Sequence, residues 1–175
     1  MLAHAPAHAQ GLNGQMINVT ILALDKASVY ENEGTQMVVP TGAAFLDIYG
    51  HTTTTVTPGQ VVFTFNSTGT FTEAIFNGFR IAETGDAPAT ITGVSLDSSS
   101  DLSGFGASRI SFDTRDVFAN VQGLSFVKGQ NVTLDLSFLP AAAVPEPFAI
   151  LTFTLAALGL GRLMVAARKK ADTAA

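Results

Sequence analysis

Strict alternation of apolar and polar residues over 131–138 constrains the fold of this chain more than any other feature of its sequence. The residues between the apolar positions are polar, and the apolar positions are Val132, Leu134, Leu136 and Phe138. Because successive side chains of a β-strand point to opposite faces of a sheet, the pattern predicts a strand with one buried face. The glycine in Lys128-Gly129-Gln130 suits a hairpin turn, so we expect 124–127 to be the partner strand.

Further short strands separated by turn residues are expected along most of the chain. Pro58-Gly59 predicts a type II turn that leads into a strand at 61–65. Other segments rich in β-branched and aromatic residues are 17–24, 44–49, 70–82, 89–96, 109–113 and 117–122. About eight strands without an amphipathic helix between them predict an all-β domain over 11–140, an antiparallel β-sandwich or jelly-roll-like fold.

The charge distribution and the absence of cysteine narrow the classes of function. Residues 11–144 contain twelve acidic and five basic side chains, so this part of the chain is strongly acidic and nucleic acid is not an expected partner. The chain has no cysteine, which excludes disulfides, thiolate metal sites and cysteine nucleophiles. No cofactor is indicated.

The segment 148–167 differs in kind from the predicted strands. Its twenty residues are apolar except for Thr152, Thr154 and Arg162, and as a helix they reach roughly the 30 Å of a membrane's hydrocarbon core. We expect a transmembrane helix here, with a buried core helix as the alternative. Arg162 lies close enough to the end of the span for its side chain to reach the headgroups.

A basic cluster and a proline-rich linker flank this predicted span. After it come Arg168, Lys169 and Lys170, which the positive-inside tendency places in a cytoplasmic tail over 168–175, with the β domain outside. Before it, the linker 141–147 contains Val144-Pro145-Glu146-Pro147, whose two prolines hold the backbone extended.

The order of motif, apolar span, basic cluster and chain end resembles the PEP-CTERM sorting signal. The resemblance covers 144–170, with Val144, Pro145, Glu146 and Pro147 as the sorting motif and with Arg162 as a departure from an uninterrupted apolar span. It implies export, recognition by an exosortase in the inner membrane, cleavage near the prolines, and association with exopolysaccharide or biofilm matrix. The implied location is an inner-membrane-anchored precursor, and afterwards the cell surface or the extracellular space. The segment 109–138, and 120–126 in particular, is also similar to the C-terminal half of β domains of this family, which implies fold kinship and no activity.

The first ten residues resemble the end of a signal peptide. They are rich in alanine, and Ala7-His8-Ala9 fits the small-x-small pattern of a signal-peptidase site, although a basic region and an apolar region before it are missing. We interpret 1–10 as the remnant of a longer signal peptide. A disordered alanine-rich N-terminus is the alternative.

Residues with the chemistry of a catalytic or metal site are few. His51 is the only histidine in the predicted domain, and its position favours a surface loop over a catalytic base. Asp97 and Asp101 have the spacing of calcium-loop ligands, but Leu102 takes the place of the required glycine, so we expect no metal site. The acidic residues Glu31, Glu33 and Asp86 are interpreted as loop charges.

Three functions remain open, in order of preference. The first is a structural or adhesive component of the surface or matrix. The second is a module that binds carbohydrate or calcium, although the chain has no tryptophan and only two tyrosines, Tyr30 and Tyr49, while its thirteen phenylalanines suit a core. The third is a hydrolase that uses Asp113 and Asp116, which would point to opposite faces of one strand unless a turn intervenes. We therefore predict no catalytic residues.

Overall fold

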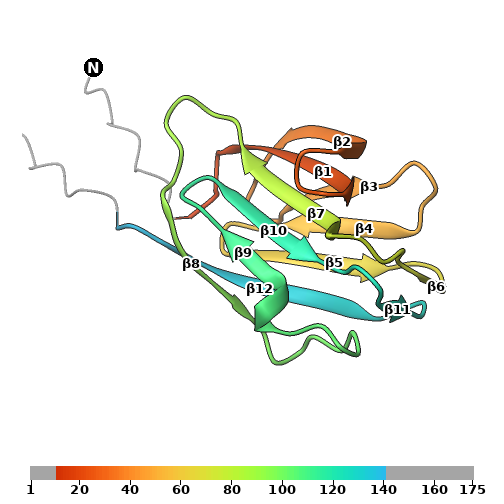
Figure 1. Cartoon of the computed structure of the whole chain (residues 1–175). Helices are drawn as coiled ribbons and strands as arrows, with labels where there is room; N and C mark the ends of the chain where they lie inside the picture. Colours follow the sequence, from red (N-terminus) through yellow and green to blue (C-terminus); the bar gives the residue numbers. More distant parts are fainter. Residues whose placement is uncertain (1–10, 141–175) are drawn as a thin grey trace, which may run out of the picture. The chain divides into compact units, whose positions relative to one another are not determined.

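The computed structural model describes residues 11–140, and in this range the chain forms antiparallel β-sheets (Figure 1). The all-β, antiparallel prediction is therefore confirmed. The first sheet has five strands in the order β2-β1-β7-β10-β9. Their bounds are β1 (Met16–Leu24), β2 (Val29–Met37), β7 (Phe76–Glu83), β9 (Ile110–Phe112) and β10 (Asp116–Asn120).

A second five-stranded sheet has the order β3-β4-β5-β12-β8. Its strands are β3 (Ala43–Leu46), β4 (Thr52–Val56), β5 (Gln60–Phe65), β8 (Ile91–Leu96) and β12 (Asn131–Phe138). A small third sheet pairs β6 (Gly69–Thr70) with β11 (Ser125–Phe126). A short 3₁₀ turn, η1 (Ala107–Arg109), precedes β9.

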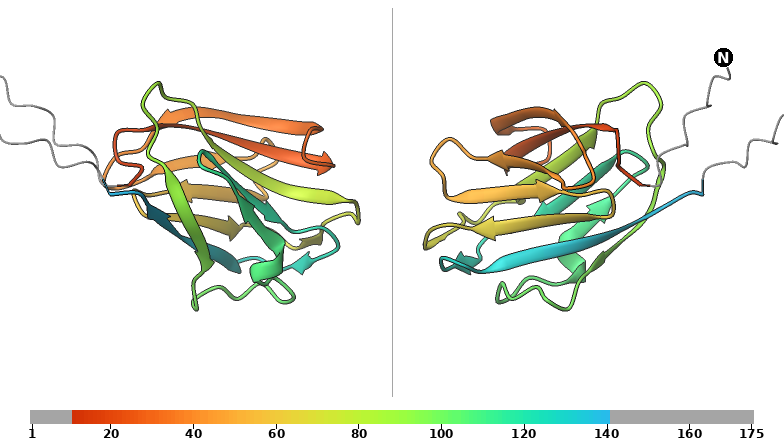
Figure 2. Two further views of the ribbon diagram at one scale, coloured as in Figure 1. Left: turned by 60° about the vertical axis from the view of Figure 1, so that its left-hand side comes forward. Right: turned by 180° about the vertical axis from the view of Figure 1, so that it is seen from behind.

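One hydrophobic core lies between the two large sheets. Alternate residues of β3, β4, β5 and β10 are buried, and in β5 these are Val61, Phe63 and Phe65, which point inward. The ring of Phe63 stacks on that of Phe79 from β7, with 4.5 Å between the centroids, so the two sheets meet directly. Figure 2 shows the two layers, and in its right-hand view β4, β5 and β12 of the second sheet come to the front.

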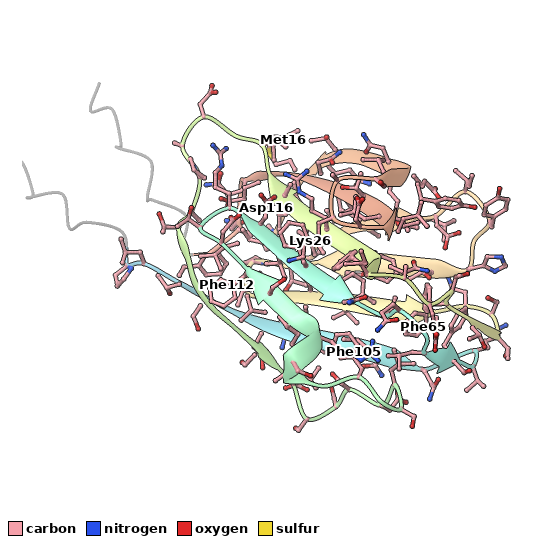
Figure 3. All side chains as sticks on the ribbon, in the orientation of Figure 1. Met16, Lys26, Phe65, Phe105, Phe112 and Asp116 are labelled. Carbon is pink, nitrogen blue, oxygen red and sulfur yellow. The ribbon has the colours of Figure 1, made fainter. Side chains whose placement is uncertain are left out.

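The outer face of the first sheet carries its own polar and aromatic contacts. Arg80 on β7 forms an ion pair with Asp116 on β10, with 3.0 Å between Nε and Oδ1. The Lys26 ammonium lies 4.4 Å from the centroid of the Phe118 ring and donates a hydrogen bond to Ser111 Oγ (Figure 3). Lys26 is thereby held on this outer face.

The structure corrects several expectations about individual strands. The described range has twelve strands, against the expected eight or so, because β2 and β4 were not foreseen and 70–82 is divided between β6 and β7. The expected hairpin of 124–127 with 131–138 is wrong, since β11 pairs with β6 while β12 pairs with β5 and β8. Pro58-Gly59 does lie in the turn before β5, but Gly59 lacks the positive φ that a type II turn requires.

Several predictions concern residues outside the described range. These are the signal-peptide remnant at 1–10, the linker and sorting motif at 141–147, the transmembrane helix at 148–167 and the basic tail at 168–175. Among residues 11–140, no helix is long and apolar enough to cross a membrane.

Candidate functional site

A cavity of about 490 Å³ opens between the two large sheets at the end where the β1–β2, β3–β4 and β6–β7 loops lie. Figure 1 shows the β3–β4 loop, β6 and β11 on the right-hand side of the domain. The volume of the cavity is typical of sites that bind small molecules. Apolar side chains of the core form part of the cavity wall. Phe79 and Phe126 are buried, and Ile21 and Phe71 are half-buried.

Asp47 organises the loop that borders this cavity. Its Oδ1 accepts hydrogen bonds from the backbone N–H groups of Tyr49 and His51, both at 2.9 Å, and its Oδ2 accepts one from Thr52 at 2.6 Å. Gly50 adopts a positive φ of 69°, which allows the chain to turn back within this short loop. The side chains of Tyr49 and His51 are consequently held as a stacked pair, with 5.9 Å between ring centroids.

Both tyrosines of the chain and the only histidine of the described range lie at the mouth of the cavity. Tyr30, Tyr49 and His51 all line it and are exposed to solvent. Interaction with the Tyr49 hydroxyl raises the pKa of Tyr30, and the negative charges of Glu31 and Asp47 add to the rise. The two tyrosines therefore lie beside each other in an electronegative mouth.

Glu31 lies inside the domain, so its interpretation as a loop charge is wrong. It belongs to β2, faces Ile21 across the strand pair, and is only 7% exposed. Its Oε1 accepts a 2.6 Å hydrogen bond from the backbone N–H of Ile48, whereas Oε2 is buried without a hydrogen-bond partner. A buried carboxylate oxygen without a donor is costly for the folded state and marks a place where a ligand could supply one.

Leu24 at the rim has an unusual backbone conformation. It ends β1, lines the cavity and has a φ of 77°, a region that a leucine side chain rarely occupies. Its side chain is 68% exposed, so no core contact explains the conformation. Further exposed apolar residues stand next to lining residues in the chain, namely Val29, Ile48 and Ile75. We call these four exposed apolar residues, which line the cavity or flank its lining residues in the chain, the rim.

Glu33 carries a second buried carboxyl group close to the cavity and also belongs to β2 rather than to a loop. Both of its carboxyl oxygens are buried without hydrogen-bond partners. Burial, together with the negative charges of Glu31 and Asp47, raises the pKa of Glu33 from 4.5 to about 7. Glu33 is therefore largely protonated in the folded state below that pH.

The raised pKa of Glu33 predicts a pH dependence of stability. The folded state holds a proton that the unfolded state has already lost between pH 4.5 and about 7, so the free energy of unfolding should fall as the pH rises through this window. Glu33→Gln should remove this component and stabilise the fold at pH 8 by about 1–2 kcal/mol, after allowance for solvent screening of a half-buried group. Urea unfolding of both proteins at pH 4.5 and 8 measures it, and an equal slope in both would contradict the assignment.

The residues predicted as weak metal or catalytic candidates lie away from the cavity. Asp97 Oδ1 accepts a hydrogen bond from the backbone N–H of Ser99, and Asp101 Oδ1 accepts one from that of Asn131. Asp113 forms a turn by accepting from the N–H groups of Arg115 and Asp116. Over residues 11–140, no three histidine or acidic side chains gather closely enough to hold a metal ion.

Sequence reasoning missed the cavity because its residues come from separate parts of the chain. The available signal was local: Tyr30-Glu31 and Asp47-Ile48-Tyr49-Gly50-His51 each place an aromatic ring beside a carboxylate. Only the pairing of β1 with β2 and the path of the β3–β4 loop bring the two segments together.

Comparison with known protein families, curated proteins and solved structures finds no significant match to the chain.

Proposed function

We propose that this chain is an exported protein of the bacterial cell surface or extracellular matrix, in which a jelly-roll-like β-sandwich domain has an adhesive role. The cavity and its exposed apolar rim carry the adhesive part of the proposal, because they give one end of the domain a surface suited to a partner. The sorting part rests on the PEP-CTERM-like order of residues in 144–170.

The proposed route runs through the inner membrane. An exosortase would recognise Val144-Pro145-Glu146-Pro147 while the apolar segment after it spans the bilayer and the basic cluster stays in the cytoplasm. Cleavage near the prolines would release the β domain to the surface or to the exopolysaccharide matrix.

Carbohydrate binding is a second candidate, favoured by the two tyrosines at the cavity mouth. Exposed aromatic rings can stack on sugar rings, and Tyr30 and Tyr49 are 62% and 63% exposed. Calcium binding has no comparable support, since Asp97 accepts a backbone hydrogen bond from Ser99 in its own loop and Asp101 accepts one from Asn131 at the start of β12.

Binding is favoured over catalysis by the way His51, the only histidine among residues 11–140, is held. His51 Nδ1 lies 2.8 Å from Ser67 Oγ, a distance that a hydrolytic serine and its base would share. In such enzymes a third group orients the imidazole. Asp47, four residues earlier, instead binds the backbone N–H of His51 and those of its neighbours, so it shapes the loop.

The proposal is tested by the mass and location of the protein in its own host with and without the exosortase. We expect a shortened, surface-located form only when the enzyme is present, and an identical C-terminus in both strains would refute the sorting role.

For adhesion, Ile48→Ser at the rim should lower retention on cells or matrix. Leu139→Ser is the matched control, because Leu139 is similarly exposed but follows β12 and has no cavity-lining neighbour in the chain, whereas Ile48 stands between the lining residues Asp47 and Tyr49. Equal retention of the two variants would argue against the rim.

A further inference from the structure

The unpartnered oxygen of Glu31 defines what the cavity lacks. Oε1 is fixed by the backbone N–H of Ile48 at 2.6 Å, which orients the carboxylate, while the buried Oε2 of this cavity-lining residue accepts no hydrogen bond. The side chain is more than nine-tenths buried. A complementary ligand must therefore bring a hydrogen-bond donor to this oxygen.

The charge around the cavity selects a cationic donor. Two carboxylates, those of Glu31 and Asp47, are among its lining residues, and none of the lining residues is a lysine or an arginine. Lys26, two residues after the rim residue Leu24, is held on the outer face of the sheet by Ser111 and Phe118. An anionic ligand such as a carboxylated polysaccharide would be repelled, whereas a cation gains a charge-assisted hydrogen bond.

The walls of the cavity indicate what should carry the charge. Ile21, Phe71 and Phe79 offer apolar surface next to the carboxylate, which suits an alkyl stem better than a ring covered with hydroxyl groups. Tyr30 and Tyr49 at the mouth add aromatic rings, the side chains that most often accompany ammonium ligands. An alkyl ammonium meets both requirements at once.

We propose that this cavity binds the ammonium group of an alkyl amine, either a free amine or a lysine side chain of a partner protein, with Glu31 as its counter-ion. The inference rests on the proposed adhesive role and specifies the chemistry recognised. Glu31 accepts from the ammonium through Oε2, and the stem lies along the apolar wall.

The experiment is a titration of the ¹⁵N-labelled full-length chain in nonionic detergent at pH 6, followed by NMR. The probes are n-butylammonium, n-butanol as its uncharged counterpart, and glucose. Nα-acetyl-lysine methylamide and its Nε-acetylated form test the protein-borne source of the same group. The backbone amide of Ile48 is the reporter, because it donates to Glu31. We expect saturable shifts with the two ammonium probes and binding at least about tenfold weaker with each uncharged counterpart.

Matched variants locate the effect. Glu31→Gln keeps an oxygen for the Ile48 N–H but removes the charge, so it should weaken ammonium binding by about tenfold or more. Glu33→Gln alters the neighbouring carboxyl, which does not line the cavity and is mostly protonated at pH 6, so it should change binding by less than about twofold. The comparison of n-butylammonium with n-butanol uses the unaltered chain and holds even if Glu31→Gln fails to fold.

Equal binding of the charged and uncharged probes, or equal loss in the two variants, would overturn the inference. Glucose binding without ammonium binding would overturn it as well and would leave the proposed adhesive role standing. Failure of the adhesive role would be seen in a separate measurement, as unchanged retention of the Ile48→Ser protein on cells or matrix. Shifts with n-butylammonium alone would assign the site to free amines, and shifts with the lysine probe as well would include a partner's side chain. Either result supports the inference.

Discussion

Replacing Phe79 with alanine is expected to lower the free energy of unfolding by about 3–5 kcal/mol. Phe79 is fully buried on β7, and its ring lies 4.5 Å from that of Phe63 and 6.3 Å from that of Phe71, measured between centroids. Truncation removes a direct contact between the two large sheets and leaves a void that joins the cavity, which Phe79 also lines. Urea unfolding followed by far-UV circular dichroism measures the loss, because the chain has no tryptophan for fluorescence.

Phe112 provides the matched control for this substitution. It has the same side chain on the edge strand β9 but is 43% exposed, so Phe112→Ala should cost less than about 1 kcal/mol. Similar losses for the two variants would contradict a core shared by the two sheets. A loss confined to Phe79→Ala, with the amide of Ile48 shifted in the NMR spectrum, would also show that this ring supports the wall of the cavity.

The strand at 131–138 was predictable because its local pattern matches its place in the fold. β12 lies inside a sheet between β5 and β8, with one face on the core, so Val132 and Leu134 are completely buried. An inner strand with one buried face must alternate apolar and polar residues. Here the sequence pattern and the tertiary environment impose the same requirement.

The strands β2 and β4 were missed because their sequences do not carry that pattern. β2 is an edge strand whose buried positions include Glu31 rather than an apolar residue, and a register shift opposite Val19 and Thr20 interrupts its pairing. β4 begins with four threonines, of which Thr52 and Thr54 point inward and the other two do not. Identical residues give no periodic signal, so only the neighbouring strands decide which threonines are buried.

The wrong hairpin shows where local turn chemistry stops being informative. Gly129 does adopt a positive φ of 94°, as a turn requires. However, its backbone N–H donates to the carbonyl of Phe65, and the carbonyl of Gln130 accepts from the N–H of Phe65. These bonds attach the turn to β5, so β12 pairs with β5 in place of the preceding segment. Long-range partners of this kind are decided by packing of the whole sheet.

The candidate site was predictable only in part, for a related reason. The exposed loop position of His51 was correctly expected, because it follows a strand and precedes a run of threonines. The burial of Glu31 was not, because glutamate is almost always exposed and the sequence did not indicate that 29–37 forms a strand. Its position depends on a hydrogen bond from Ile48, seventeen residues away, and no motif in the sequence encodes that bond.

Gly78→Ala should destabilise the fold by about 3 kcal/mol, since it adds a methyl group where two backbones meet. Gly78 lies in the middle of the first sheet, opposite Leu22 on β1 and Asn120 on β10. A Cβ at this position would overlap the carbonyl oxygen of Ala119 and lie 3.2 Å from the Cα of Asn120. Backbone atoms of a central strand cannot rotate away as a side chain can, so β7 and β10 would have to separate.

Gly93 offers a control with the opposite expectation. It is also a strand glycine, in β8 opposite Ser137, but a Cβ there would meet the Ser137 side chain at an ordinary 3.5 Å. Gly93→Ala should be neutral or stabilise by up to about 1 kcal/mol, because alanine restricts the unfolded chain more than glycine does. Urea midpoints of the two variants compare the sites directly. If both variants unfold at the same urea concentration, close backbone contact between β7 and β10 is not what requires glycine at position 78. If only Gly78→Ala is destabilised, the close approach of β7 and β10 requires glycine at position 78, next to Phe79, which reaches the wall of the cavity.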